Sequence, residues 1–314
     1  GDHERSLQAS AEAAALAKDV FGAGRPHARV FDARALHARA LGNLGHYREA
    51  ADELVDVVAG VERLFGAANP MVAYYSADVA RFRLDQGNPS AALAYAERAA
   101  SLLASALEAD PYTAAIARFN VGRAQLALRR ATQALETLSS ARDAARQARG
   151  PTSPLAMDIS SHIALALAQQ GKLDEAGREV DAGLAHWRAA TGLHAFRGQH
   201  HAGVVRRLAR DWPAAIALQQ AALAALDDKP QHTKRRAAAT SEWALAEVEQ
   251  GDAASALRRL QTVADPDAAA SAAASGDHGG GGVRERRRCR TRGRGDHAGA
   301  HAQHARAHGP ADDR

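Results

Sequence analysis

The hydrophobic positions of this 314-residue chain follow a helical period. Apolar side chains recur three and four residues apart, as at Ile159, Ile163 and Leu167. Segments of about 15 to 20 residues with this spacing are separated by Gly, Pro and short polar stretches. No segment shows the alternation that strands require, so the pattern predicts an all-α protein.

A short motif repeats along the chain at intervals of 39 to 42 residues. In each copy a predicted helix ends at a turn and an Ala follows five residues later. The turn positions are Gly45, Gly87, Arg129, Gly171, Arg210 and Gly251, and the alanines are Ala50, Ala92, Ala134, Ala176, Ala215 and Ala256.

A second set of small residues lies seven positions before each turn. Its members are Ala38, Ala80, Gly122, Ala164, Gly203 and Ala244. Two antiparallel helices joined by a tight turn approach closely only where the crossing side chains are small. The period therefore predicts a solenoid of antiparallel helix pairs.

Helix starts agree with this period. Asn69, Asp110 and Ser153 each precede a Pro, which is the order of a capping side chain followed by the first helical residue.

Together these features resemble the tetratricopeptide repeat. The 42-residue spacing and the segment from Phe65 to Ala73, with Gly66 and Pro70, are similar to the longer kinesin-light-chain type of this repeat. The resemblance covers residues 1–263 and implies a right-handed superhelix whose first helices line a concave, partner-binding groove. Such arrays are found attached to bacterial signalling proteins, and they bind many unrelated partners.

We divide the chain accordingly. Residues 1–263 form the repeat array, with a half-repeat at 1–22 followed by about five repeats. Arg129 and Arg210 replace the usual turn Gly, so those two turns are expected to be strained or differently shaped. The first helix around 193–199 has the weakest sequence signals.

Residues 264–314 form a low-complexity Ala/Gly/Arg/His tail, which we expect to be disordered. The segment 276–314 contains nine Arg and five acidic residues and so accounts for the whole formal charge of +4. We favour a non-native or frame-shifted ending. The alternative is an Arg/Gly-rich tail that binds nucleic acid, although the aromatic residues typical of RNA-binding segments are missing.

Histidines in this tail are spaced by four, three and four residues, and a helix would bring them onto one face. They are His297, His301, His304 and His308. Gly residues weaken such a helix, so we favour a solvated coil and expect no metal site.

Composition narrows the cellular setting. Cys289 is the only cysteine, so the fold uses neither a disulfide nor a cysteine-based zinc site. No apolar run is long enough to span a membrane, and the first residues do not resemble a signal peptide. We expect a cytoplasmic protein, and the strong preference for Arg over Lys suggests a bacterial, GC-rich genome.

Motifs of known catalytic sites and of phosphate-binding loops are absent from the sequence. His200 and His201 are neighbours on one predicted helix, where their side chains diverge and cannot share a metal. We therefore predict no enzyme activity and no cofactor.

Candidate partner-binding residues come from the first helices. Arg39, Arg81 and Arg123 lie six residues before successive turns, and Asp78, Asn120 and His162 lie nine before theirs. Phe119 lies ten before its turn and could face the groove. Three unpaired guanidinium groups would form a positive stripe for an acidic peptide; the alternative is a solvated face neutralised by Asp78 and Asp85.

The sequence thus predicts a non-catalytic scaffold that binds a protein or peptide in its concave groove, within a bacterial signalling or regulatory protein. We expect no membrane and no nucleic-acid partner. Two alternatives remain open: a nucleic-acid-associated protein acting through the tail, and the repeat region of an enzyme, such as a serine/threonine kinase, whose catalytic domain lies elsewhere.

Overall fold

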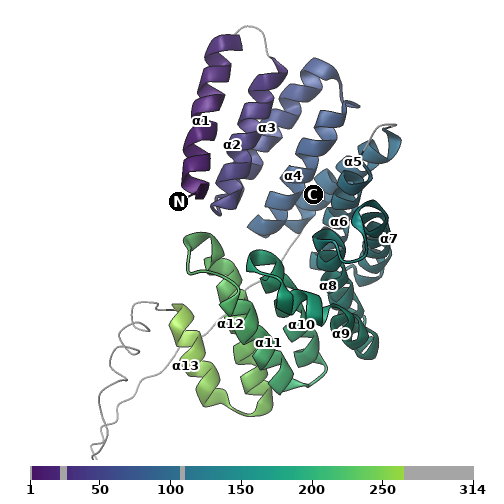
Figure 1. Cartoon of the computed structure of the whole chain (residues 1–314), viewed down its shortest axis with the longest axis vertical. Coiled ribbons are helices and arrows are strands. Elements are labelled where there is room, and N and C mark those ends of the chain that lie inside the picture. Colours follow the sequence, from purple (N-terminus) through teal and green to yellow (C-terminus); the bar gives the residue numbers. More distant parts are fainter. Residues whose placement is uncertain (1, 22–26, 107–109, 265–314) are drawn as a thin grey trace, which may run out of the picture. The chain divides into compact units, whose positions relative to one another are not determined.

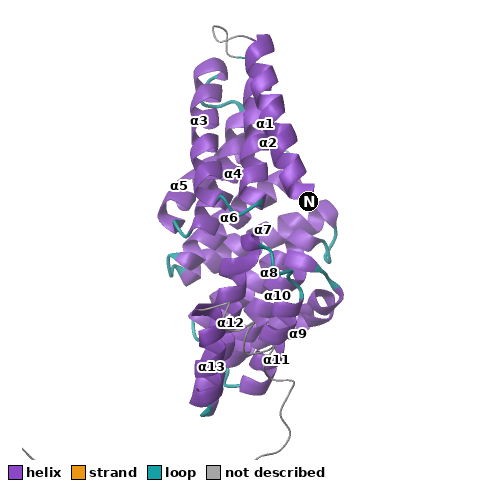
Figure 2. Cartoon of the chain, turned by 90° about the vertical axis from the view of Figure 1, so that its left-hand side faces the viewer, coloured by secondary structure: helices purple, strands orange, loops and turns teal. Residues whose placement is uncertain are grey.

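The computed structural model describes residues 2–21, 27–106 and 110–264. Within these ranges the secondary structure consists of helices joined by short loops, with no strand (Figures 1 and 2). The predicted all-α solenoid of helix pairs is confirmed.

Six antiparallel pairs follow a single first helix, α1 (Asp2–Phe21). The pairs are α2 (Ala28–Asn43) with α3 (Tyr47–Phe65), α4 (Pro70–Gln86) with α5 (Pro89–Ser105), α6 (Pro111–Ala127) with α7 (Ala131–Arg149), α8 (Pro154–Gln169) with α9 (Leu173–Ala189), α10 (Gly192–Leu208) with α11 (Trp212–Ala224), and α12 (Thr233–Gln250) with α13 (Ala253–Ala264). A short 3-10 helix, η1 (Pro230–His232), precedes α12. The described residues therefore hold six pairs after α1, where about five were expected. The second helices of the last two pairs, α11 and α13, are short, with 13 and 12 residues.

The even-numbered helices form one layer of the solenoid. Every helix packs on its neighbours in the chain, but from α2 to α12 each even-numbered helix also contacts the next even-numbered one. Helices on the crowded, inner side of a curved stack lie closer together than those outside. The even-numbered helices, which are the first helices of the pairs, therefore line the concave side.

Close crossings hold each pair together. All twelve small residues that carry the repeat, at five positions after and seven before each turn, are buried. At Gly122 an added methyl group would lie 2.6 Å from the Leu138 side chain, and at Gly203 it would lie 2.5 Å from the Gln219 amide. The small residues are therefore required by the distance between the helices.

Helix starts follow the predicted Pro signals in all but one detail. The side chains of Asn69 and Asp110 accept hydrogen bonds from backbone N–H groups of the first turns of α4 and α6. The Ser153 hydroxyl makes no such bond to α8 and is buried without a partner. Nothing in the surrounding structure explains why Ser153 does not cap.

The turn within each pair contains one residue with a left-handed backbone conformation, and this residue is Arg in two pairs and Gly in the others. Arg129 and Arg210 have φ angles of 61° and 62°, in the region that the glycines at the other turns occupy. A side chain in this region costs about 1 kcal/mol or more. These two turns are therefore strained and keep the same shape as the others.

Replacing Arg129 by Gly is expected to raise the free energy of unfolding by about 1 kcal/mol, because the strain of the exposed turn is removed. Chemical denaturation followed by circular dichroism measures the change. The reverse substitution is Gly171→Arg, at a turn with φ 78° where a Cβ would meet no atom within 4 Å. Gly171→Arg should lower the free energy of unfolding by a similar amount. If neither substitution changes the free energy of unfolding, the left-handed turns are not strained by a side chain.

The tail lies outside the described residues. This applies to the predicted disorder, to the nucleic-acid-binding alternative and to the histidine series from His297 to His308. Among the helices that are described, none combines the length and the apolar character needed to cross a bilayer.

Candidate functional site

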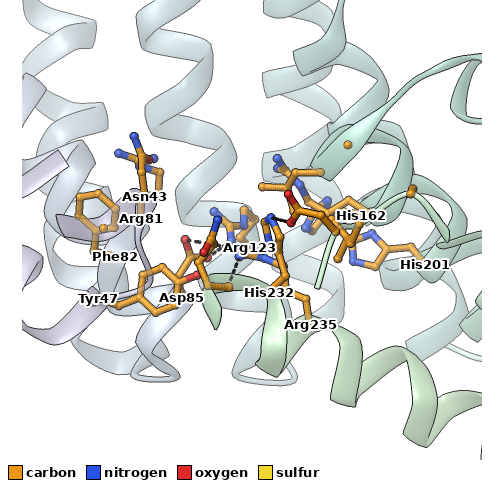
Figure 3. Close-up of a pocket in the computed structure, with 18 residues that line it drawn as sticks. Asn43, Tyr47, Arg81, Phe82, Asp85, Arg123, His162, His201, His232 and Arg235 are labelled. Carbon is orange, nitrogen blue, oxygen red and sulfur yellow. Dashed lines mark hydrogen bonds and ion pairs between the residues drawn. The ribbon is translucent and has the colours of Figure 1, made fainter. Parts of the chain in front are cut away.

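A cavity of about 690 Å³ lies on the concave side of the even-numbered helices (Figure 3). Residues from α2, α3, α4, α6, α8, α10 and the α11–α12 connection with α12 line it. They are Gly42, Asn43, Tyr47, Arg81, Phe82, Asp85, Arg123, His162, Gly192, Leu193, Arg197, His201, Ala225, Leu226, Asp227, Gln231, His232 and Arg235. The cavity therefore collects side chains from every helix pair of the described array.

Four arginines from four different helices line this cavity: Arg81 of α4, Arg123 of α6, Arg197 of α10 and Arg235 of α12. The guanidinium of Arg81 lies over the Phe82 ring, 4.1 Å from its centroid. That of Arg235 lies 5.7 Å from the centroid of the Tyr47 ring. Such cation–π contacts orient the planar guanidinium groups without neutralising them.

Asp85 stands between two of the arginines. Arg123 Nη2 donates to Asp85 Oδ1 at 3.2 Å, and Arg235 Nη2 lies 3.9 Å from Asp85 Oδ2. Figure 3 shows Asp85, Arg123, His232 and Arg235 together at the centre of the cavity. One carboxylate thus faces two guanidinium groups that come from distant parts of the chain.

Arg197 is held from behind by a buried carboxylate. Its Nη1 lies 2.7 Å from Asp158 Oδ2, and Asp158 Oδ1 lies 2.7 Å from His194 Nδ1. Burial alone would raise the pKa of Asp158, but the hydrogen bond from His194 and the charge of Arg197 lower it below its ordinary value. Asp158 is therefore ionised at neutral pH and fixes the position of Arg197.

Two neutral histidines form the wall between α8 and α10. The rings of His162 and His201 meet edge to face, with centroids 4.5 Å apart, and His162 meets Phe119 in the same way at 4.9 Å. Burial lowers the pKa of His162 to about 3 and also places the pKa of His201 well below 6.5. Both imidazoles are uncharged at neutral pH.

The predicted groove residues divide into two groups. Arg81, Arg123 and His162 line the cavity. Phe119 and Asn120 are buried in the wall behind it, where Asn120 Nδ2 donates to the Ala77 carbonyl oxygen and Phe119 packs on His162.

The arginines of the predicted stripe are not unpaired, and the pairing agrees with the alternative, in which Asp78 and Asp85 neutralise them. Arg39 pairs with Asp78 at 2.7 Å, and Asp78 also accepts from Arg81 at 3.3 Å. Arg123 pairs with Asp85. The reason is the register of the repeat, which brings a carboxylate of α4 next to the arginine of each neighbouring helix.

Arg197, His201 and Arg235 were not predicted as site residues. His201 lies nine positions before the turn at Arg210, as His162 lies nine before Gly171. Extending the register to α10 would therefore have identified His201, and Arg197, four residues earlier, shares its helix face. Arg235 reaches the cavity through the fold of η1 and the start of α12, for which the sequence carries no comparable signal.

Metal binding has no support within the described part of the chain. No group of three His, Cys, Asp or Glu residues there is arranged to hold an ion. His200 and His201 are half-buried, with ring centroids 5.7 Å apart, as expected for neighbours on a helix.

Solved structures with a similar fold are repeat proteins. A Rap protein complexed with Competence and Sporulation Factor has a TM-score of 0.62 at 16% identity, and the match covers 83% of this chain and 73% of that one. Kinesin-light-chain TPR-like repeats from Podosopora anserina match with a TM-score of 0.50 at 19% identity, over 59% and 87% of the two chains. The apo form of RapI matches with a TM-score of 0.50 at 12% identity, over 85% and 77%.

No protein-family model and no curated protein matches this sequence. The structural likeness, the six helix pairs and the left-handed turns therefore carry the assignment. The described part of the chain has the fold of the tetratricopeptide-repeat proteins and is similar to solved kinesin-light-chain TPR-like repeats.

Proposed function

We propose that this chain is a non-catalytic scaffold that binds an acidic segment of a protein or peptide in its concave groove. The observation that carries the proposal is the convergence of Arg81, Arg123, Arg197 and Arg235 on one cavity. Guanidinium groups bind carboxylates through charge-assisted, paired hydrogen bonds. A partner that runs along the groove would contact several helix pairs at once.

Two further points support a binding role. The Rap protein with a similar fold was solved in complex with Competence and Sporulation Factor. In this chain, the Ser161 hydroxyl lies 2.9 Å from His201 Nδ1, but Ser161 is fully buried and no substrate could reach it. This pair is therefore a structural contact, which agrees with a non-catalytic role.

We place the scaffold in the cytoplasm of a bacterium, within a signalling or regulatory protein.

Fluorescence anisotropy with a labelled hexaglutamate peptide tests the proposal on the full chain. We expect saturable binding that weakens as salt is added. Arg123→Ala should weaken it by about 1–3 kcal/mol, because Arg123 contributes charge-assisted hydrogen bonds in a partly desolvated site.

The matched control is Arg188→Ala, an exposed arginine near the end of the outer helix α9. It should bind the probe like the original chain. Equal losses in the two variants, or no loss in Arg123→Ala, would show that the peptide binds elsewhere, for example through the arginine-rich segment 276–314.

A further inference from the structure

The cavity carries more cationic than anionic side chains. Its four arginines face two carboxylates, Asp85 and Asp227, while its three histidines are His162, His201 and His232. Burial lowers the pKa of all three imidazoles. At neutral pH the lining therefore has a formal excess of two positive charges.

Ion pairs behind the lining do not remove this excess. Asp78 pairs with Arg81 and Asp158 with Arg197, but Asp78 is shared with Arg39, and Asp227 lies 2.6 Å from Lys229. The network of described residues therefore contains six cationic side chains and four carboxylates. The cations are Arg39, Arg81, Arg123, Arg197, Lys229 and Arg235, and the carboxylates are Asp78, Asp85, Asp158 and Asp227. Like charges at short range destabilise an empty site, so the network favours an added anion.

Arg197 has donor groups that face the cavity. Among the described residues, Asp158 is its one hydrogen-bonding or ionic partner, and its Nε is buried without an acceptor. Its side chain lines the cavity and remains 29% exposed. Burial lowers the pKa of Arg197, the charge of Asp158 raises it in part, and the smaller effects of Arg123 and Arg235 lower it further. A guanidinium group has five N–H donors, and Asp158 is paired with it at Nη1, so an anion at this end of the cavity would accept from donors of Arg197 that remain exposed.

We propose that the cavity binds a phosphoryl group, held by Arg123, Arg197 and Arg235. A phosphate monoester carries close to two negative charges at neutral pH and offers three acceptor oxygens. It matches the excess of two charges and can accept from guanidinium groups that approach from three helices. A single carboxylate supplies half that charge. The inference deepens the proposed function, because it names the chemical group that the groove would hold.

The phosphoryl group can belong to a phosphorylated side chain of a bound peptide or to a small free phosphate. Isothermal titration of the full chain separates these sources with matched probes. The probes are inorganic phosphate, phenyl phosphate, benzoate, and a capped Gly-Gly-Tyr-Gly-Gly peptide with its Tyr unmodified, phosphorylated or replaced by Glu. We expect phenyl phosphate to bind at least about tenfold more tightly than benzoate, and the phosphopeptide about tenfold more tightly than its Glu form.

Variants connect the binding to the named arginines. Arg235→Met should weaken phenyl phosphate binding by about tenfold or more, and Arg197→Met likewise, whereas Arg188→Met on the outer face should leave it unchanged. Arg197→Lys keeps the charge next to Asp158 and should retain part of the affinity, which guards against a loss caused by unfolding. Circular dichroism confirms that each variant is folded.

The outcomes separate the two proposals. Equal affinity for phenyl phosphate and benzoate, or equal losses in Arg188→Met and Arg235→Met, would overturn the phosphoryl site even if hexaglutamate binds. Tight binding of phenyl phosphate without any binding of hexaglutamate or phosphopeptide would support the site and overturn the peptide-binding function. Inorganic phosphate binding as tightly as the phosphopeptide would support the site and assign it to a free phosphate.

Discussion

Replacing Gly198 by Ala is expected to lower the free energy of unfolding by about 1–3 kcal/mol, although Ala is the better helix former. Gly198 lies in α10 against the indole ring of Trp187, a fully buried side chain of α9. An added methyl group would overlap the Cγ and Cδ atoms of that ring. Because Gly183 of α9 packs against the opposite end of the same ring, the indole cannot shift away without losing contacts.

Gly177→Ala is the matched control, since Gly177 also lies inside a helix, α9, but has only the flexible end of Arg206 within 4.0 Å. This change should raise the free energy of unfolding by about 0.5–1 kcal/mol. In a double-mutant cycle, Gly198→Ala should cost less in the Trp187→Leu background than in the original chain, because the smaller side chain leaves room for the methyl group. Urea unfolding followed by circular dichroism measures the original chain, the three single variants and the double variant. A Gly198→Ala protein as stable as the original would show that Trp187 does not occupy this slot.

Local signals explain why the helix pairs could be predicted. The turn at Gly171, the Pro at the start of α8 and the small residues at the crossings each act within one repeat, so a single sequence contains the information. Arg129 and Arg210 weakened the turn signal, yet the backbone adopts the left-handed conformation at both. Packing of the flanking helices therefore outweighs the cost of that conformation.

The α9–α10 region was harder to predict because its packing depends on how one large side chain, Trp187, fits between the two helices. The helix around 193–199 lacks the usual Pro, and α10 begins instead at Gly192, which has a φ of 59°. The glycines at 183 and 198 are unfavourable for helices in isolation. They are explained only once Trp187 is known to lie between α9 and α10.

The candidate site could be predicted in part. Arg81, Arg123 and His162 follow from the repeat register, because equivalent positions on successive first helices face the same side. The pairing of Arg123 with Asp85 links neighbouring repeats and is compatible with that register. The contact of Arg235 with Asp85 and Tyr47 joins positions about 150 and 190 residues apart, and it depends on how far the solenoid curves, which the period does not specify.

Acid is expected to destabilise the protein strongly through His162 and His201, the two histidines in the wall of the cavity. His162 and His201 have pKa values far below 6.5 in the folded protein because burial penalises their charged forms. In the unfolded chain both titrate near 6.5, so the unfolded state binds more protons as the pH falls below that value. The stability contributed by each neutral imidazole is therefore complete above pH 6.5 and is lost on acidification, down to about pH 3 for His162.

Each of the two histidines should lower the free energy of unfolding by roughly 1.4 kcal/mol per pH unit below 6.5, or about 2 kcal/mol by pH 5. Urea titrations at pH 7.5 and 5.0 measure the difference. His162→Asn can keep the hydrogen bond that His162 Nδ1 donates to the Asp158 carbonyl oxygen at 2.8 Å, but it cannot take up a proton. It should reduce the acid-induced loss by about 2 kcal/mol, whereas the exposed His46→Asn should leave the loss as it was. An acid-induced loss that His162→Asn does not reduce would mean that His162 accepts a proton readily in the fold, and that the wall of the cavity is open to water.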